Sequence, residues 1–200
     1  AVYHLAQCVN DTQVWRVIRG EVEDETSFVG LVVAYVDDLL LLMPCSGLRT
    51  AFNAALRGLW TLSSEQVLDG SAQFMFLGIE MQRTPSGDIL VHQASFVRSV
   101  LSSYGLDGTS KPITAVTMAL PTAEDLPPDA VLLKTLQKYA GEFNWLATRT
   151  RSDLAYFTSV IASTATKFAD WTLQLCKKVL RYLCGTLNAG IRFPVGGDSS

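Results

Sequence analysis

The chain has 200 residues, 48% of them hydrophobic and 18% charged, which is enough for one large domain or two small ones around a substantial core. No stretch of 18 residues is apolar and free of charge and no signal peptide is recognisable, so we expect no membrane span and no membrane partner. The net charge of −3 is uneven: residues 1–90 hold 5 Lys/Arg against 11 Asp/Glu, and residues 131–192 hold 9 against 3. Such halves suit metal binding beside a polyanion, and ordinary solvated helix faces are the alternative.

The first predicted elements are two strands, over residues 13–19 and 27–35, with an acidic turn at Glu21–Glu25 between them. The second strand leads into the most informative segment, Leu31–Met43, which reads L-V-V-A-Y-V-D-D-L-L-L-L-M. Two adjacent aspartates interrupt an otherwise apolar run. A buried carboxylate is costly unless it is paired, hydrogen-bonded or bound to a cation, so this segment predicts either a sharp turn or a metal site.

Asp37 and Asp38 are predicted at the tip of a tight hairpin between Ala34–Val36 and Leu39–Leu41, because a straight strand would point them to opposite faces. At the edge of a hydrophobic sheet they would suit Mg²⁺, which binds one or two carboxylates together with phosphate oxygens. Two such ions, about 3.5–4 Å apart, can align the attacking and leaving oxygens of phosphoryl transfer. A solvent-exposed turn that happens to read Asp-Asp is the alternative.

Helix and hairpin signals follow in turn. Ser46 is the predicted N-cap of an amphipathic helix. Residues 74–83 and 89–91 are predicted to form a hairpin around the turn-rich residues 84–88, and a helix is expected over about 95–104. This first part of the chain therefore predicts antiparallel strands with helices packed on them.

Residues 105–130 contain four prolines and little periodicity, and we predict a surface linker there that forms the domain boundary. Three helices are expected beyond it. The second begins at Asp153, and the third is capped by Asp170 and ends at Leu183. The first carries an apolar stripe of 4-3-4-3 spacing, made of Leu132, Leu136, Tyr139, Phe143 and Leu146.

Four segments, in this order, resemble those of copia-type retrotransposon reverse transcriptases. Tyr35–Asp38 (YVDD) resembles the family's YxDD box, and Phe76–Met81 (FLGIEM), followed by Gln93, resembles the segment after that box. Trp145–Tyr156 (WLATRTRSDLAY) is similar to the family's L-x-TRPD-I-x-Y stretch, and Leu180–Thr186 (LRYLCGT) to LRYLKGT. The resemblance covers most of the chain, and the shared order makes it specific.

The resemblance implies an α+β fold: an antiparallel palm-like sheet with packed helices, followed by a mainly helical thumb and connection region. Residues 1–104 would form part of the palm, and residues 105–130 the linker. Residues 131–193 would form the thumb and connection, and residues 194–200 a tail leading toward an absent ribonuclease H domain. The location implied is intracellular, in a cytoplasmic particle or the nucleus.

The resemblance also assigns roles. Asp37 and Asp38 take the place of two adjacent catalytic aspartates that bind Mg²⁺ or Mn²⁺. Tyr35 and Val36 would lie beside the primer end and the nascent base pair. The implied partners are an RNA or DNA template-primer, deoxynucleotides, and the missing fingers, palm and ribonuclease H segments. A primer-grip-like hairpin would consist of Phe76, Leu77 and Gly78, where the glycine would allow another backbone to approach closely, a sheet bulge being the alternative.

Basic helices in the second half are candidates for phosphate contacts without sequence readout. The alternative for Arg151 is a structural ion pair with Asp153 at the start of a helix. The candidate contacts are Arg149, Arg151, Lys177, Lys178 and Arg181.

Departures from the family pattern limit what we expect of the chain. Nothing before Asp37 matches the "LDVKTAFL"-type stretch that bears the family's third metal-binding aspartate, and the fingers are absent. Ser152 replaces a proline and Cys184 a lysine. We therefore expect no polymerase activity from this chain alone, and a catalytically dead nucleic-acid-binding or interaction remnant is the alternative function.

Overall fold

The computed structural model describes residues 3–20, 27–70, 73–106, 111–121 and 128–195. The chain divides into two compact units, Ala1–Gln66 and Val67–Ser200, each combining an antiparallel sheet with helices. The predicted α+β class is confirmed. The predicted acidic turn Glu21–Glu25 lies outside the described residues, as does most of the predicted tail.

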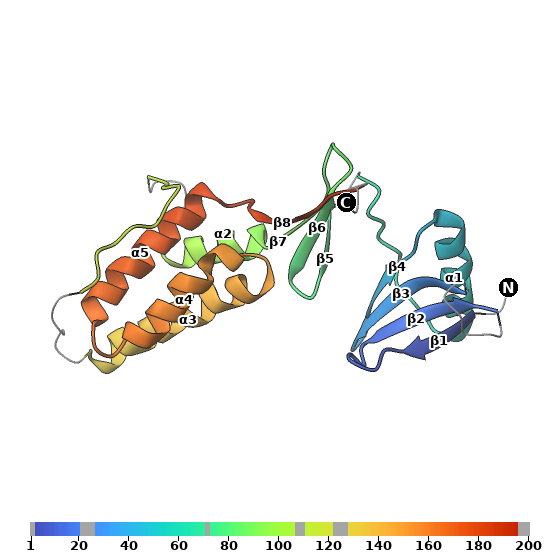
Figure 1. The fold of residues 1–200 in the computed structure, drawn as a ribbon, viewed down its shortest axis with the longest axis horizontal. Coiled ribbons are helices and arrows are strands. Elements are labelled where there is room, and N and C mark those ends of the chain that lie inside the picture. Colours follow the sequence, from blue (N-terminus) through green and yellow to red (C-terminus); the bar gives the residue numbers. More distant parts are fainter. Residues whose placement is uncertain (1–2, 21–26, 71–72, 107–110, 122–127, 196–200) are drawn as a thin grey trace. The chain divides into compact units, whose positions relative to one another are not determined.

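Unit 1 is a four-stranded antiparallel sheet in the order β1-β2-β3-β4, with helix α1 on one face (Figure 1). The elements are β1 (Tyr3–Gln7), β2 (Val14–Arg19), β3 (Phe28–Tyr35), β4 (Asp38–Leu42) and α1 (Ser46–Leu59). Phe52 and Leu56 of α1 pack on Val17 and Val32 of the sheet and form the buried core of this unit. Burial of these side chains, roughly 1.5–3 kcal/mol each, holds the helix on the sheet.

The other face of this sheet is apolar and half-exposed. Strand side chains alternate between faces, so the register opposite the α1 face groups Val14 with Val33 and Leu40, and Tyr35 with Asp38. None of these side chains is fully buried. The adjacent aspartates thus stand at the end of an open, largely apolar sheet surface.

Unit 2 combines a second sheet, in the order β5-β6-β7-β8, with four α-helices and one 3₁₀ turn. The strands are β5 (Phe74–Phe76), β6 (Ile79–Arg83), β7 (Ile89–His92) and β8 (Gly190–Phe193). The helices are α2 (Ala94–Ser103), α3 (Ala130–Arg149), η1 (Ser152–Leu154), α4 (Ala155–Thr164) and α5 (Ala169–Gly185).

The core of unit 2 lies among its helices. The predicted stripe on α3 faces this core: four of its residues are buried, and Leu132 packs against them at the edge. Asp129 begins the helix by accepting hydrogen bonds from the backbone N–H groups of Val131 and Leu132, at 2.9 and 2.7 Å. Among the described residues no helix is long and apolar enough to cross a membrane.

The predicted boundary at 105–130 is not where the chain divides. The middle part of that stretch, residues 111–121, runs along α5 inside unit 2 (Figure 1). Strand β8 follows α5 in sequence and pairs with β7, with Val91 opposite Ile191. The second hairpin and the helical region are therefore one unit, because side-chain bonds and a strand pair with long sequence separation join them.

Candidate metal and nucleic-acid site

The YVDD segment forms the predicted hairpin. Tyr35, the last residue of β3, pairs with Asp38, the first of β4, so Val36 and Asp37 form a two-residue turn. Asp37 and Asp38 are both exposed, and Asp38 shares the open face of the sheet with Tyr35. The geometry differs from the expectation in one detail: Asp38 belongs to the strand rather than to the tip.

Val36 occupies an unfavourable backbone conformation in that turn. Its φ is +52°, and its side chain is 88% exposed. Positive φ is sterically costly for a β-branched residue, by about 1–3 kcal/mol, and such strain gathers at functional sites. The surrounding hairpin thus holds an exposed valine beside the two carboxylates at a cost in stability.

The FLG segment forms a second two-residue turn. Phe76 pairs with Ile79, and Leu77 and Gly78 between them have φ of +53° and +76°. Two positive φ values define a type I′ turn, which favours glycine in the second position. In the described chain Val36 and Leu77 are the non-glycine residues with positive φ, and each opens a hairpin turn that the resemblance singled out.

Within the described residues, no other protein backbone closely approaches Gly78. A Cβ at this position would meet the ring of Trp145 at 3.8 Å, an ordinary contact, and no backbone lies within 4 Å. The positive φ of the turn by itself accounts for the glycine, and its approach to a primer backbone stays a prediction.

An exposed cation lies beside this turn. The guanidinium of Arg149 stacks over the ring of Trp145, with Cζ 4.7 Å from the ring centroid, and the same ring contacts the Gly78 position. Of the five basic candidates, Arg149 is the one that the structure brings next to the second hairpin. An aromatic ring carrying a cation can stack on a base and attract phosphate.

Arg151, two residues further on, is instead 1% exposed. It donates to both carboxylate oxygens of Asp153, at 3.0 and 2.8 Å, and to the carbonyl and hydroxyl oxygens of Thr186, at 3.0 and 2.8 Å. Because four of its five N–H donors are already used, Arg151 is unsuited to bind phosphate, and the predicted contact is corrected here. The structural alternative, the Arg151–Asp153 ion pair, is confirmed.

Asp153 also accepts a hydrogen bond from Tyr182 at 2.8 Å. Partial burial raises the pKa of the Asp153 carboxyl, but the bonds from Arg151 and Tyr182 outweigh this effect and hold the pKa below its usual value. The charged network joins the segment after α3 to the end of α5.

A second buried group, Glu80, fixes the start of α2. It is 1% exposed and accepts hydrogen bonds from the backbone N–H and the hydroxyl of Ser95, both at 2.7 Å. Burial raises the pKa of the Glu80 carboxyl, but the two bonds from Ser95 and smaller contributions reverse the shift, so the pKa lies below its usual value. His92 Nδ1 lies 3.5 Å from Glu80 Oε2 and accepts a hydrogen bond from the Ala94 N–H.

Gln93 completes this buried set. It lies at the head of α2, and its Oε1 accepts from the Thr150 hydroxyl at 2.9 Å. The burial of Glu80, Gln93 and Thr150 was not predicted. Their only signal in the sequence was their place in the segments that resemble the family, whereas for Arg151 the ion pair with Asp153 had been the alternative.

Two further basic candidates on α5 hold the segment 111–121, here called the strap. Lys178 Nζ donates to the Thr117 carbonyl at 2.6 Å, and Arg181 Nε donates to the Lys111 carbonyl at 2.9 Å. Lys177 is exposed. The structure therefore does not gather the five basic candidates into one surface.

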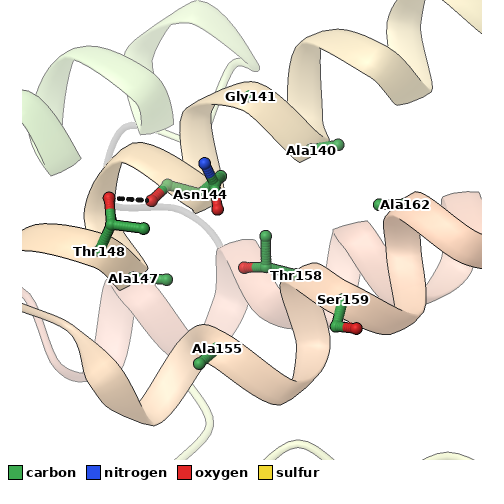
Figure 2. A pocket seen from close by; sticks show the side chains of 9 residues that line it. All are labelled: Ala140, Gly141, Asn144, Ala147, Thr148, Ala155, Thr158, Ser159 and Ala162. Atoms are coloured by element: carbon green, nitrogen blue, oxygen red, sulfur yellow. Dashed lines mark hydrogen bonds between the residues drawn. The ribbon is translucent and has the colours of Figure 1, made fainter.

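A groove of about 440 Å³ lies between α3 and α4 (Figure 2). Its lining is small or neutral: Ala140, Gly141, Asn144, Ala147, Thr148, Ala155, Thr158, Ser159 and Ala162. No titratable group lines it, so it offers no acid–base or metal chemistry.

The aspartate pair fits part of a metal site. Mg²⁺ is commonly held by one or two carboxylates, with waters and substrate phosphates completing its shell. Within the described ranges no group of three His, Cys, Asp or Glu side chains is placed to hold a metal. Asp11 is engaged elsewhere, accepting from the Gln13 N–H at 2.9 Å.

Comparison with known proteins places the chain among mobile-element proteins. It is 30% identical over 195 residues to the retrovirus-related Pol polyprotein from transposon RE1 of Arabidopsis thaliana, covering 96% of this chain and 12% of that protein. It is 22% identical over 167 residues to the putative transposon Ty5-1 protein of Saccharomyces cerevisiae, covering 84% of this chain and 53% of that protein. The chain is related to retrotransposon proteins.

This retrotransposon-related chain spans about half the length of one relative and a small part of the other. No family model matches it, and no solved structure matches it. The two relatives support an origin in a retroelement Pol protein, and the matched region with RE1 covers nearly the whole chain.

Proposed function

We propose that the chain is part of an RNA-directed DNA polymerase, contributing the second half of its palm and its thumb and connection. The observation that carries this proposal is the Tyr35–Asp38 hairpin, whose two exposed carboxylates stand at the end of an open apolar sheet face. Such a face leaves room for a nucleic-acid duplex beside the acids.

In this proposal Asp37 and Asp38 would hold Mg²⁺ or Mn²⁺. Such an ion would offset negative charge on the phosphates of an incoming deoxynucleotide and would favour ionisation of the primer 3′-hydroxyl that attacks them. Tyr35 contributes a half-exposed ring on the same sheet face as Asp38, where a template-primer would lie. The chain's own contribution is positioning, which is the larger part of phosphoryl-transfer catalysis by proteins.

In unit 2 the Leu77–Gly78 turn, Trp145 and Arg149 would contact the nucleic-acid backbone. The turn presents backbone groups, the ring offers a stacking surface, and Arg149 supplies an exposed positive charge. Each of these contacts is independent of base sequence, as a polymerase requires.

The experiment that tests the metal role uses Mn²⁺ as a paramagnetic probe in NMR spectra of the full chain. We expect Mn²⁺ to broaden the amide signals of the hairpin turn, and the paired change Asp37→Asn with Asp38→Asn to abolish this broadening. Asp11→Asn is the matched control, because it removes an exposed turn aspartate elsewhere in unit 1. Equal broadening in the double variant would sink the proposal.

The isolated chain should support no primer extension, since the proposed chemistry uses three metal-binding carboxylates and the described residues bring no third one to the hairpin pair. Magnesium-dependent synthesis by the chain alone would show that Asp37 and Asp38 need no further segment to form the site.

A non-catalytic nucleic-acid-binding remnant is the second candidate. It is favoured by the lack of a third metal-binding side chain among the described residues, combined with the exposed Arg149 on Trp145. Binding to single-stranded DNA that weakens steeply with salt, in a chain that does not bind Mn²⁺ at the hairpin, would support this candidate over the polymerase.

A further inference from the structure

The strap, residues 111–121, is docked on one stripe of α5 by side chains that donate to its backbone. Lys178 and Arg181 donate to the carbonyls of Thr117 and Lys111, and Trp171 Nε1 donates to the Ala119 carbonyl at 2.8 Å. The donors recur at helical spacing and therefore lie on one face of α5.

At the C-terminal end of this stripe, Gly185 leaves room for the backbone of the strap to approach the helix closely. A Cβ at Gly185 would lie 2.6 Å from the Ile113 carbonyl oxygen, closer than real contacts allow. Ile113 also donates its backbone N–H to the Arg181 carbonyl at 3.2 Å. The strap is thus a docked segment rather than a chain lying loosely on the surface.

The strap nevertheless buries little apolar surface on α5. No strap residue is fully buried: Val116 and Met118 pack at the edge of the unit 2 core, and Leu120 is 73% exposed. Segments with few buried apolar contacts open at low free-energy cost. Two of the three side-chain anchors are cations bound to neutral carbonyls, whereas a phosphate would add the attraction between opposite charges to such bonds.

We propose that nucleic-acid phosphates compete with the strap for Lys178 and Arg181, so that strap docking occupies two cations of α5 that lie beside the exposed Lys177. This inference rests on the proposed nucleic-acid-binding function and adds a regulatory contact to it. Release of the strap would free Lys178 and Arg181 beside the already exposed Lys177, which gives three cations within two turns of one helix and fits a polyanionic backbone.

The decisive measurement is hydrogen exchange at the Ile113 amide, whose proton is bound to Arg181, in the full chain with and without single-stranded DNA. We expect DNA to accelerate this exchange, because binding and docking are mutually exclusive and coupling is reciprocal. DNA that binds in a salt-dependent manner and leaves Ile113 exchange unchanged would overturn the proposal.

A variant approach tests the same coupling from the other side. Met118→Ser weakens the apolar hold of the strap without touching the cations, and should raise DNA affinity about fivefold, the low end of typical coupling between two sites. The slope of log affinity against log salt should stay the same, because DNA displaces the strap in both proteins and the same phosphate contacts form. Leu120→Ser, in the exposed part of the strap, is the matched control and should change neither.

Adding Lys178→Ala and Arg181→Ala to Met118→Ser should remove the gain. A gain that persists would overturn the proposal, because the masked cations would then not be its source. If the chain and all its variants fail to bind DNA, the proposal falls together with the nucleic-acid-binding function. If binding depends on Arg149 alone, the binding function stands and the strap proposal fails by itself.

Discussion

The segments that resemble the polymerase family differ in burial between the two units. In unit 1 the YVDD residues lie at an exposed hairpin end, with two carboxylates in solvent and a strained valine beside them. In unit 2 Glu80 and Arg151 of the corresponding segments turn inward and hold strands, helices and turns together, whereas Arg149 is exposed. Burial therefore distinguishes the residues of such a segment that stabilise the fold from those that are free to contact a ligand.

The largest expected effect comes from a pair of arginines that differ in burial. Arg151→Ala should lower the free energy of unfolding of unit 2 by about 3 kcal/mol, the low end for a broken buried ion pair, because Asp153 keeps 41% of its side chain exposed. Arg149→Ala should cost about 0.5 kcal/mol, as for an exposed cation on a ring. Urea unfolding, followed by amide signals of α3, measures both.

Substitution of the same two arginines should have different effects on DNA binding. Arg149→Ala should weaken salt-dependent DNA binding, while Arg151→Ala should leave it unchanged under conditions where the variant is folded. A stable, fully folded Arg151→Ala protein that has lost DNA binding would reverse the assignment.

Glu80→Gln should remove about 2 kcal/mol from the free energy of unfolding of unit 2, because an amide accepts weaker bonds from Ser95 than a carboxylate does. The pKa of Glu80 is lowered by folding, so its stabilising effect is present above the unfolded pKa of about 4.5 and is lost as the pH falls through the lower folded value. Acid titration of the unit 2 amide signals should therefore give a shallower loss of stability in Glu80→Gln. An identical acid profile in the two proteins would show that Glu80 does not carry this dependence.

Gly78→Ala should destabilise unit 2 by about 1 kcal/mol, since a Cβ is costly at a φ of +76° even though its nearest neighbour, Trp145, leaves room for it. Gly58→Ala in α1 is a control without positive φ, and there a gain of similar size is expected from helix propensity. Thermal unfolding with unit-specific probes distinguishes the two signs.

The smallest expected effects concern the strained turn residues. Val36→Asn and Leu77→Asn should each stabilise their own hairpin by about 0.5–1 kcal/mol, because Asn tolerates positive φ better than Val or Leu. If the Val36 side chain contacts the template-primer, Val36→Asn should bind it more weakly although its hairpin is more stable, and Leu77→Asn should bind as before. Equal binding in both variants would make the valine a plain turn residue.

Much of the local structure could be read from the sequence. The YVDD hairpin followed from two carboxylates inside a β-branched apolar run, and the α3 stripe from its 4-3-4-3 spacing. Both signals are short-range and depend on side-chain pattern alone. Helix starts moved by a residue or two, as at Asp170, which follows the first residue of α5 rather than capping it.

The features that were missed depend on long-range contacts. The Pro-rich stretch reads as a linker, yet Lys178 and Arg181 bind its carbonyls, and backbone acceptors leave no mark in composition. Arg149 and Arg151 look alike in a charge pattern, although one is exposed and the other buried. Strand β8 is short and finds its partner about a hundred residues earlier, so no local pattern could reveal it.

The position of β8 near the end of the chain affects when the second sheet can be completed during synthesis. Unit 1 closes all its pairings within the first 66 residues, whereas Asp88 must wait for Arg192, 104 positions later, to complete its ion pair across the edge of β7. At about 5–20 residues per second, a ribosome needs roughly 5–20 s to cover that distance. For that interval one border of the second sheet is open to other strands, and a chaperone or neighbouring nascent chain would meet it there first.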